Sequence, residues 1–136
     1  MMSKEEFNAF LPSIGGLVDG YGTRPAEPFY LFGCECDDGW LELIAELIRE
    51  LIDADWTREI KQIKEKFGGL RFYAEGLPEN GHEIIVKYET RAWKICEICG
   101  SEENVQLRVS GWVKTLCDQC APPWFEKRHL SHLRIE

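Results

Sequence analysis

Six cysteines are the residues of this sequence best suited to chemistry, and four of them form two matched pairs. Cys96 and Cys99 make the first C-x-x-C pair, and seventeen residues separate it from the second pair, Cys117 and Cys120. This spacing is typical of a four-cysteine zinc site. Each pair lets one tight turn direct two sulfurs toward one point, and two such turns supply the corners of a tetrahedron. The sequence therefore predicts one bound Zn²⁺ with Cys96, Cys99, Cys117 and Cys120 as its ligands.

The predicted site is structural, because four thiolates leave no open position for water or substrate, and a catalytic zinc normally keeps one. Two disulfides are the alternative use of four cysteines. No secretory leader is visible in residues 1–10, which are charged, so we interpret the cysteines as metal ligands in a reducing cytoplasm. Gly100 follows the first pair, where such a turn often requires a positive φ.

The other two cysteines, Cys34 and Cys36, form a C-x-C pair beside Asp37 and Asp38. Half of a second metal site is one interpretation. We favour two free thiols followed by a helix cap, because no further cysteine or histidine cluster remains to complete a ligand set. Asp38 is then the predicted N-cap of the next helix.

The charge of the chain is uneven. It has 136 residues and a net charge of −8. Residues 1–93 hold ten Lys and Arg against eighteen Asp and Glu, whereas residues 94–136 hold six of each. An acidic N-terminal part disfavours non-specific binding to duplex nucleic acid. Solubility is the simplest use of this charge, and a basic partner or mimicry of nucleic acid are the alternatives. No stretch is apolar enough to predict a transmembrane helix.

The first thirty residues predict a short helix and a long loop. Ser3 and Glu6 have capping-box spacing for a helix over Ser3–Leu11, which Pro12 should end. Glycines and prolines predict a loop over Ile14–Pro28, held to the core by Leu17, Val18 and Tyr21. A buried strand is expected at Phe29–Phe32.

The core-forming elements follow. Trp40–Asp53 is predicted to be an amphipathic helix, because its apolar residues recur at helical spacing. That stripe consists of Trp40, Leu43, Ile44, Leu47, Ile48, Leu51 and Ile52.

The stretch Ile60–Glu75 reads either as a helix or as two strands. We favour a β-hairpin with Gly68-Gly69 as its turn. One face would then carry Ile63, Glu65, Phe67, Leu70, Phe72 and Ala74. The other face would carry Lys64, Lys66, Arg71 and Tyr73, a basic and aromatic patch that we interpret as a solvated sheet face.

The C-terminal third predicts a zinc module. A helix over Glu83–Ile95 runs directly into Cys96. Strands are expected at Val105–Val109 and Trp112–Leu116 around a turn at Ser110-Gly111, and a closing helix at Pro123–Leu133. This order resembles a treble-clef zinc finger. The predicted fold is α+β, with an acidic helix-plus-hairpin body (1–94) fused to a treble-clef-like zinc module (95–136), packed together as one unit.

Several stretches together resemble a family of small bacteriophage and prophage proteins that has no assigned activity. The resemblance spans roughly residues 34–120, and its most specific part is Lys64–Tyr73, KEKFGGLRFY. The other parts are Asp38-Gly39-Trp40, the Cys96–Gly100 turn, and the stretch from Gly111-Trp112 to Thr115-Leu116-Cys117. Relatives often carry histidine at the last ligand position, and Cys120 departs from that without weakening the site. The resemblance implies expression in a bacterial cytoplasm during infection or lysogeny.

The leading functional hypothesis is a non-enzymatic protein that binds a host or phage protein, for example a host defence complex that it inhibits. No catalytic triad, phosphate-binding glycine loop or paired-carboxylate motif stands out.

Nucleic-acid binding through the zinc module is the alternative. Its basic residues are Arg108, Lys114, Lys127, Arg128, His129, His132 and Arg134, with Trp112 and Trp124 able to stack on bases. The module has no net charge, which weakens this hypothesis. An HNH-like nuclease is the third hypothesis, and it would need a histidine near Thr115-Leu116.

Overall fold

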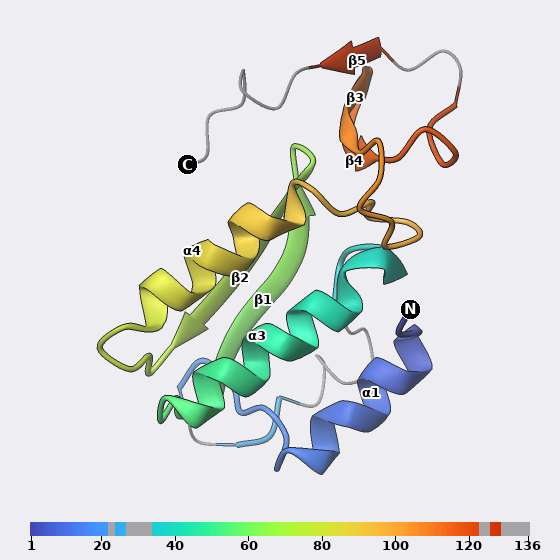
Figure 1. The fold of residues 1–136 in the computed structure, drawn as a ribbon. Coiled ribbons are helices and arrows are strands. Elements are labelled where there is room, and N and C mark those ends of the chain that lie inside the picture. Colours follow the sequence, from blue (N-terminus) through green and yellow to red (C-terminus); the bar gives the residue numbers. More distant parts are fainter. Residues whose placement is uncertain (22–23, 27–33, 123–125, 129–136) are drawn as a thin grey trace.

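The computed structural model describes residues 1–21, 24–26, 34–122 and 126–128, and it confirms the predicted α+β class (Figure 1). The helix α3 (Leu41–Asp53) lies in the centre of the body and contacts α1 (Lys4–Ser13) on one side and α4 (Gly81–Ala92) on the other. The hairpin of β1 (Glu59–Lys66) and β2 (Gly69–Glu75) packs against these helices. The strands β3 (Gln106–Ser110), β4 (Trp112–Leu116) and β5 (Glu126–Arg128) form a separate sheet in the C-terminal module.

The first helix begins as predicted and ends later. Ser3 and Glu6 form the complete capping box. Pro12 does not end the helix, which runs to Ser13 with Pro12 inside it, so that prediction was wrong. In the last turn a proline forfeits only one N–H···O bond, and the end is made instead by the Gly16 N–H, which donates to the Leu11 carbonyl at 2.9 Å.

The segment after α1 is only partly held to the core. Leu17 is 1% exposed, as predicted, but Tyr21 is 85% exposed, so its predicted packing on the core is wrong. The Val18 N–H donates to the Arg58 carbonyl at 2.8 Å and ties the loop to the start of β1. The predicted strand at Phe29–Phe32 lies outside the described residues.

The central helix confirms the apolar stripe. Six of its seven predicted members are buried, and Ile52 is half-buried. Asp38 does not cap α3 as predicted: it opens the 3-10 turn η1 (Asp38–Trp40), and α3 starts at Leu41 with no side-chain cap. Gly39 and Trp40 donate hydrogen bonds to the carbonyls of Glu97 and Ile95, and these contacts hold the backbone of the turn just before α3 begins.

The hairpin prediction is confirmed, but the turn is shifted by one residue. Lys66 pairs with Gly69, so Phe67 and Gly68 form the turn, with φ of 54° and 85°. Gly69 is needed for a different reason, because rings of Trp93 lie 2.7 and 2.8 Å from where its Cβ would stand. Phe67 therefore leaves the buried face on which it was predicted and is 70% exposed.

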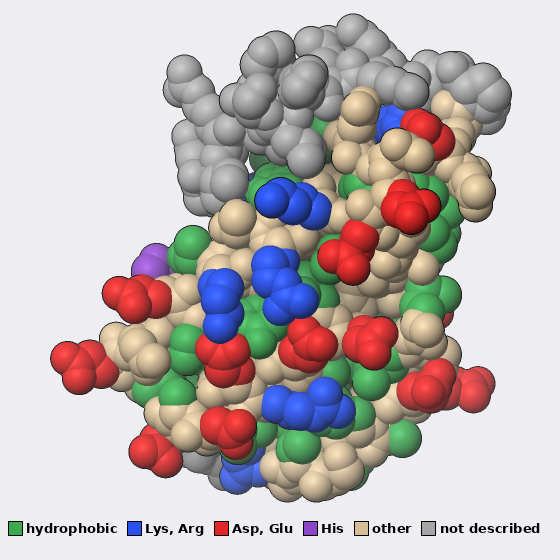
Figure 2. Space-filling view, viewed as in Figure 1, with side chains coloured by type: hydrophobic (Ala, Val, Ile, Leu, Met, Phe, Trp, Pro, Cys, Tyr) green, Lys and Arg blue, Asp and Glu red, His purple; other side chains and the backbone are tan. Residues whose placement is uncertain are grey.

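The helix α4 completes the body and leads to the module. It ends at Ala92, three residues before the predicted end, and Ile95 is buried beyond it. Lys87 and Arg91 of α4 pair with Glu50 and Glu46 of α3 at 2.7 and 3.4 Å. Figure 2 shows the result, with Lys and Arg side chains interspersed among Asp and Glu over the middle of the visible face. The described part of this face therefore carries charges of both signs side by side.

In the module, the predicted hairpin is confirmed as β3 and β4, which flank Gly111. The predicted closing helix over Pro123–Leu133 is wrong at 126–128, where the backbone forms β5 and pairs with β3. The rest of that predicted helix lies outside the described residues. Within the described ranges, no helix is long and apolar enough to cross a membrane.

The central helix generates a stability prediction. Leu47 is fully buried, so Leu47→Ala should lower the free energy of unfolding by about 3 kcal/mol, from lost apolar burial and the cavity left behind. Val86→Ala, at a 39% exposed position on α4, should change it by about 0.5 kcal/mol or less. Urea unfolding followed by circular dichroism measures both. Equal effects would show that the stripe is not the core.

Candidate metal centre

The four predicted ligands sit on two tight turns. In the first, the Gly100 N–H donates to the Cys96 carbonyl at 2.9 Å, and the Cys96 N–H donates to the Ser101 carbonyl at 2.8 Å. Gly100 has φ of 78°, the positive value that the sequence predicted. In the second, the Ala121 N–H donates to the Cys117 carbonyl at 3.1 Å. Both turns leave their cysteine side chains on one side.

The turns bring the four sulfur atoms together. The Sγ atoms of the two pairs all lie within 4.8 Å of one another, and those of Cys99 and Cys117 are 3.7 Å apart. In a tetrahedral site with Zn–S bonds of about 2.3 Å, neighbouring sulfurs are about 3.8 Å apart. All six cysteines of the chain are free thiols, so no disulfide competes for these atoms. The cluster could hold a metal ion.

The electrostatics of the thiols fit this use. Burial raises the pKa of Cys117, but hydrogen bonds from the backbone N–H and the side chain of Cys120 outweigh it and bring the value to about 7. Burial and the neighbouring thiols raise the pKa of Cys120 far above its ordinary value. The thiols of the cluster therefore lose their protons at different pH values. A cation that replaces these protons would offset the repulsion between neighbouring thiolates.

Cys34 and Cys36 stand apart from this cluster. Among the described residues, the grouping that could hold a metal contains neither of them. Burial raises the pKa of Cys34 well above its ordinary value, so its thiol is held neutral. The backbone of this pair has the structural role: the Lys4 ammonium donates to the Cys34 carbonyl at 2.8 Å and to the Cys36 carbonyl.

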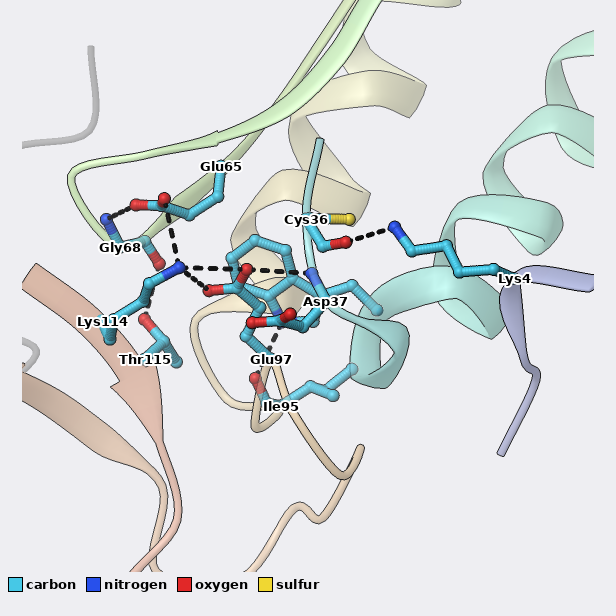
Figure 3. Close-up of polar contacts among 10 residues, drawn as sticks. Lys4, Cys36, Asp37, Glu65, Gly68, Ile95, Glu97, Lys114 and Thr115 are labelled. Atoms are coloured by element: carbon cyan, nitrogen blue, oxygen red, sulfur yellow. Dashed lines mark hydrogen bonds and ion pairs between the residues drawn. The ribbon is translucent and has the colours of Figure 1, made fainter. Parts of the chain in front are cut away.

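Glu97, inside the first cysteine turn, fastens the cluster to the body. The residue is 0% exposed, and its carboxylate accepts the Asp37 N–H at 3.1 Å and a bond from the Lys114 ammonium at 3.2 Å (Figure 3). Burial raises the pKa of Glu97, and the Asp37 amide and Lys114 oppose that rise. A buried carboxylate is tolerated only with such partners, so its position is strictly defined.

Lys114 extends this network to the hairpin. Its ammonium lies between the carboxylates of Glu97 and Glu65, 3.4 Å from the latter. Burial lowers the pKa of Lys114, but the two carboxylates outweigh it and raise the value, so the side chain stays charged. Glu65 in turn accepts the Gly68 N–H at 2.7 Å, and the Thr115 hydroxyl donates to the Gly68 carbonyl at 2.6 Å (Figure 3). The tip of the β1–β2 hairpin is thereby bonded to β4.

The turn before α3 makes the third attachment. The Gly39 N–H donates to the Glu97 carbonyl at 2.7 Å, and the buried Trp40 indole N–H donates to the Ile95 carbonyl at 2.8 Å. A Cβ on Gly39 would overlap the carbonyl oxygens of Cys96 and Glu97. The metal turn and the body are therefore in backbone contact. The predicted boundary between residues 94 and 95 stays a prediction.

Two of the basic side chains that were candidates for contacting nucleic acid, those of Arg108 and Lys114, are engaged within the protein. The Arg108 side chain is 2% exposed, and it donates to Asp118 at 2.7 Å and to the Leu116 carbonyl at 3.1 Å. Lys114 is engaged as described above. Neither is presented for phosphate contacts. The side chains of Lys127 and Arg128, and residues His129, His132, Arg134 and Trp124, lie outside what the structure describes. Trp112 is 75% exposed.

The position at which an HNH-like site would need a histidine is held by the buried Thr115. Thr115 is 0% exposed, and its hydroxyl bonds to the hairpin tip. It faces the body rather than an open cleft.

Sequence reasoning found the four cysteines and missed the residues that fasten them. Glu97 and Lys114 gave no pattern, because their partners lie 60, 17 and 49 positions away in the chain. The one available signal was a carboxylate placed between two metal-binding cysteines.

Comparisons of the chain with protein-family models, curated proteins and solved structures find no match.

The Gly39 contact generates a prediction. Gly39→Ala should lower the free energy of unfolding by about 2 kcal/mol, because backbone atoms of the metal turn must shift to admit the methyl group. Bound metal should also dissociate faster into a chelator. Gly20→Ala is the matched control, since its methyl would meet only the flexible Lys61 side chain at 3.2 Å. Wild-type stability and metal retention in Gly39→Ala would contradict the contact.

Proposed function

We propose that the protein is a non-enzymatic binding protein whose four cysteines hold one structural zinc ion. The observation that carries this proposal is the convergence of four thiols within 4.8 Å, on two turns of which the first is bonded to the body. Four sulfur ligands suit Zn²⁺, which favours tetrahedral thiolate sites. They also leave no coordination position for a substrate. Zinc thus serves here to fix the fold.

The four thiols would supply all the ligands, and residues of the body would hold the turns in place. Lys114 places one positive charge beside the first turn, where it compensates the buried carboxylate of Glu97. The proposed chemistry is binding alone, with no reaction at the metal.

The metal prediction is one zinc per chain. Cys99→Ser should abolish stoichiometric zinc and unfold the module, because three thiolates form an incomplete site. Cys36→Ser, outside the cluster, should keep one zinc. Elemental analysis and native mass spectrometry measure both. Zinc-free wild type, two zinc ions per chain, or full zinc in Cys99→Ser would each refute the site.

The binding proposal commits to a protein partner. Large aromatic side chains stand exposed at Tyr21, Phe67 and Trp112, and aromatic residues are enriched in protein interfaces. The net charge of −8 repels phosphate, and two of the module's cations are engaged internally. By its resemblance to phage proteins, we propose a bacterial cytoplasm as the setting and a host protein, such as part of a defence complex, as the partner.

The partner test uses the tagged full chain in a bacterial lysate with and without nuclease. The captured protein should remain after nuclease treatment. It should also remain when Lys127, Arg128 and Arg134 are changed to glutamine, because the proposed interface does not depend on phosphate contacts. Capture that nuclease abolishes would overturn the proposal. So would a gel shift of short DNA or RNA near physiological salt that the triple variant removes.

A further inference from the structure

The free edge of β2 has a defined set of backbone groups. Lys66 pairs with Gly69 across the turn, so the hydrogen-bonded pairs of the hairpin continue at Lys64–Arg71 and Gln62–Tyr73. Leu70 and Phe72 then direct their N–H and C=O groups away from β1. Ala74 lies beyond a bulge in β1 and is opposite Ile60, whose N–H donates to the Val18 carbonyl at 2.9 Å outside the hairpin, so the backbone groups of Ala74 also point outward. The other side of the hairpin is satisfied, because Glu35 bonds to Ile63 and Glu65 of β1 at 2.9 and 3.0 Å.

Only part of this edge is occupied. The Phe72 N–H donates to the carboxylate of Glu89, which reaches over from α4, at 3.0 Å. Near the turn, Trp93 covers Gly69. At Ala74, which is half-buried, the structure gives the outward amide and carbonyl no partner among the residues it describes. Unpaired backbone groups along a strand edge are a template for another strand.

A groove runs along this edge, between β2 and α4, which lie side by side (Figure 1). Ala74, Leu77 and Ile85 form the apolar part of the groove. The helix α4 also contributes His82 and Glu89, and β2 contributes an arginine. The lining residues that matter are Arg71, Tyr73, Ala74, Leu77, Ile85 and Glu89. Arg71 forms no ion pair with any carboxylate in the described part of the chain, whereas the nearby Lys61 and Glu75 pair with each other at 2.7 Å.

We propose that this groove binds an extended segment of a partner protein, which adds to the free edge of β2 as a further strand. The inference rests on the proposed binding function and names its surface. Phe72 and Ala74 supply the backbone hydrogen bonds. Side chains alternate along the added strand, so one set meets Ala74, Leu77 and Ile85 and the other meets Arg71 and Tyr73. The segment therefore alternates apolar and acidic residues.

Glu89 holds the place of the incoming strand. Its carboxylate accepts the hydrogen bond from the Phe72 N–H that the carbonyl of an added strand would accept in its place. Burial raises the pKa of Glu89 above its ordinary value. Replacing a poorly solvated carboxylate with a neutral carbonyl keeps Phe72 satisfied and returns Glu89 to water. In the free protein the same contact covers part of an exposed strand edge.

The test uses the zinc-loaded full chain, labelled with ¹⁵N, and a short capped peptide in which valine and glutamate alternate. Titration should shift the amide signals of Phe72 and Ala74. Methylating the peptide's alternate backbone nitrogens should weaken binding about tenfold, since a strand cannot pair without its N–H groups. This change lies in the ligand, so it cannot unfold the protein. An unchanged affinity would overturn strand addition.

The charge of the segment is tested on the protein. Arg71→Glu should weaken binding of the valine–glutamate peptide about tenfold and strengthen binding of a valine–lysine peptide. Lys66→Glu makes the same charge change on β1, away from the groove, and should leave the affinity within about twofold, since salt screens remote charges. Equal effects of the two variants would overturn the groove. Amide shifts confined to Phe67 and Trp112 would also overturn the groove as the binding surface. So would self-association of the protein through the groove, detected as an oligomer that Arg71→Glu abolishes.

The failure of this inference differs from the failure of the proposed function. A nuclease-resistant partner captured equally by wild type and Arg71→Glu would reject the groove and leave the binding function standing. Loss of that partner in Arg71→Glu, with capture retained in Lys66→Glu, supports both.

Discussion

The buried carboxylate of Glu97 is the contact on which the arrangement of the two parts depends. A carboxylate withdrawn from water costs several kcal/mol unless it is paired and hydrogen-bonded. Here the partners come from three places in the chain, namely the Asp37 amide, the Lys114 ammonium, and, through Lys114, the carboxylate of Glu65. No one of these segments can move away without leaving a buried charge unpaired. These paired charges therefore hold the module to the body.

This contact also explains why a four-cysteine site suits the protein. In the turn that carries Cys96 and Cys99, Cys96 is buried, whereas Ile98 and Cys99 are exposed. Glu97 lies between those two cysteines and bonds to the body, so a bound metal ion would hold the turn from one side while Glu97 holds it from the other. Removing the ion would free the thiols and with them the position of Glu97. With an ion bound, metal binding and the packing of the module would be coupled, as in small domains that fold around an ion.

The sequence revealed the elements whose signals are local. The stripe on α3, the capping box of α1, the paired cysteines and the β1–β2 hairpin all follow from periodicity or short spacing. All are confirmed, with the turn of the hairpin one residue earlier than predicted. The misplaced features depend on contacts far along the chain. Gly69 reads as a turn residue, but it serves to admit Trp93, and Phe67 is displaced into the turn as a result. Asp38 reads as a helix cap, but Gly39 and Trp40 are bonded to the metal turn first. Residues 126–128 form a strand because β3 offers them an edge, which no helical propensity could show.

The β1–β2 hairpin connects the module that carries the candidate metal centre with the proposed peptide-binding groove. An isolated two-stranded hairpin is marginally stable in water, and its free edge would fray. In this protein one face is buried against the helices, the β1 side is bonded to Glu35, and the tip is fixed to β4 through Thr115 and Lys114. Of the two strand edges of the hairpin, the edge of β2 beside α4 is the one left partly open. A strand edge fixed in this way loses little conformational entropy when a peptide pairs with it, which is the usual advantage of preorganised binding sites. The metal centre does not touch the groove. Lys114 and Thr115, which lie on β4 just before Cys117, bond to the hairpin and help to fix the strand from which one wall of the groove is built.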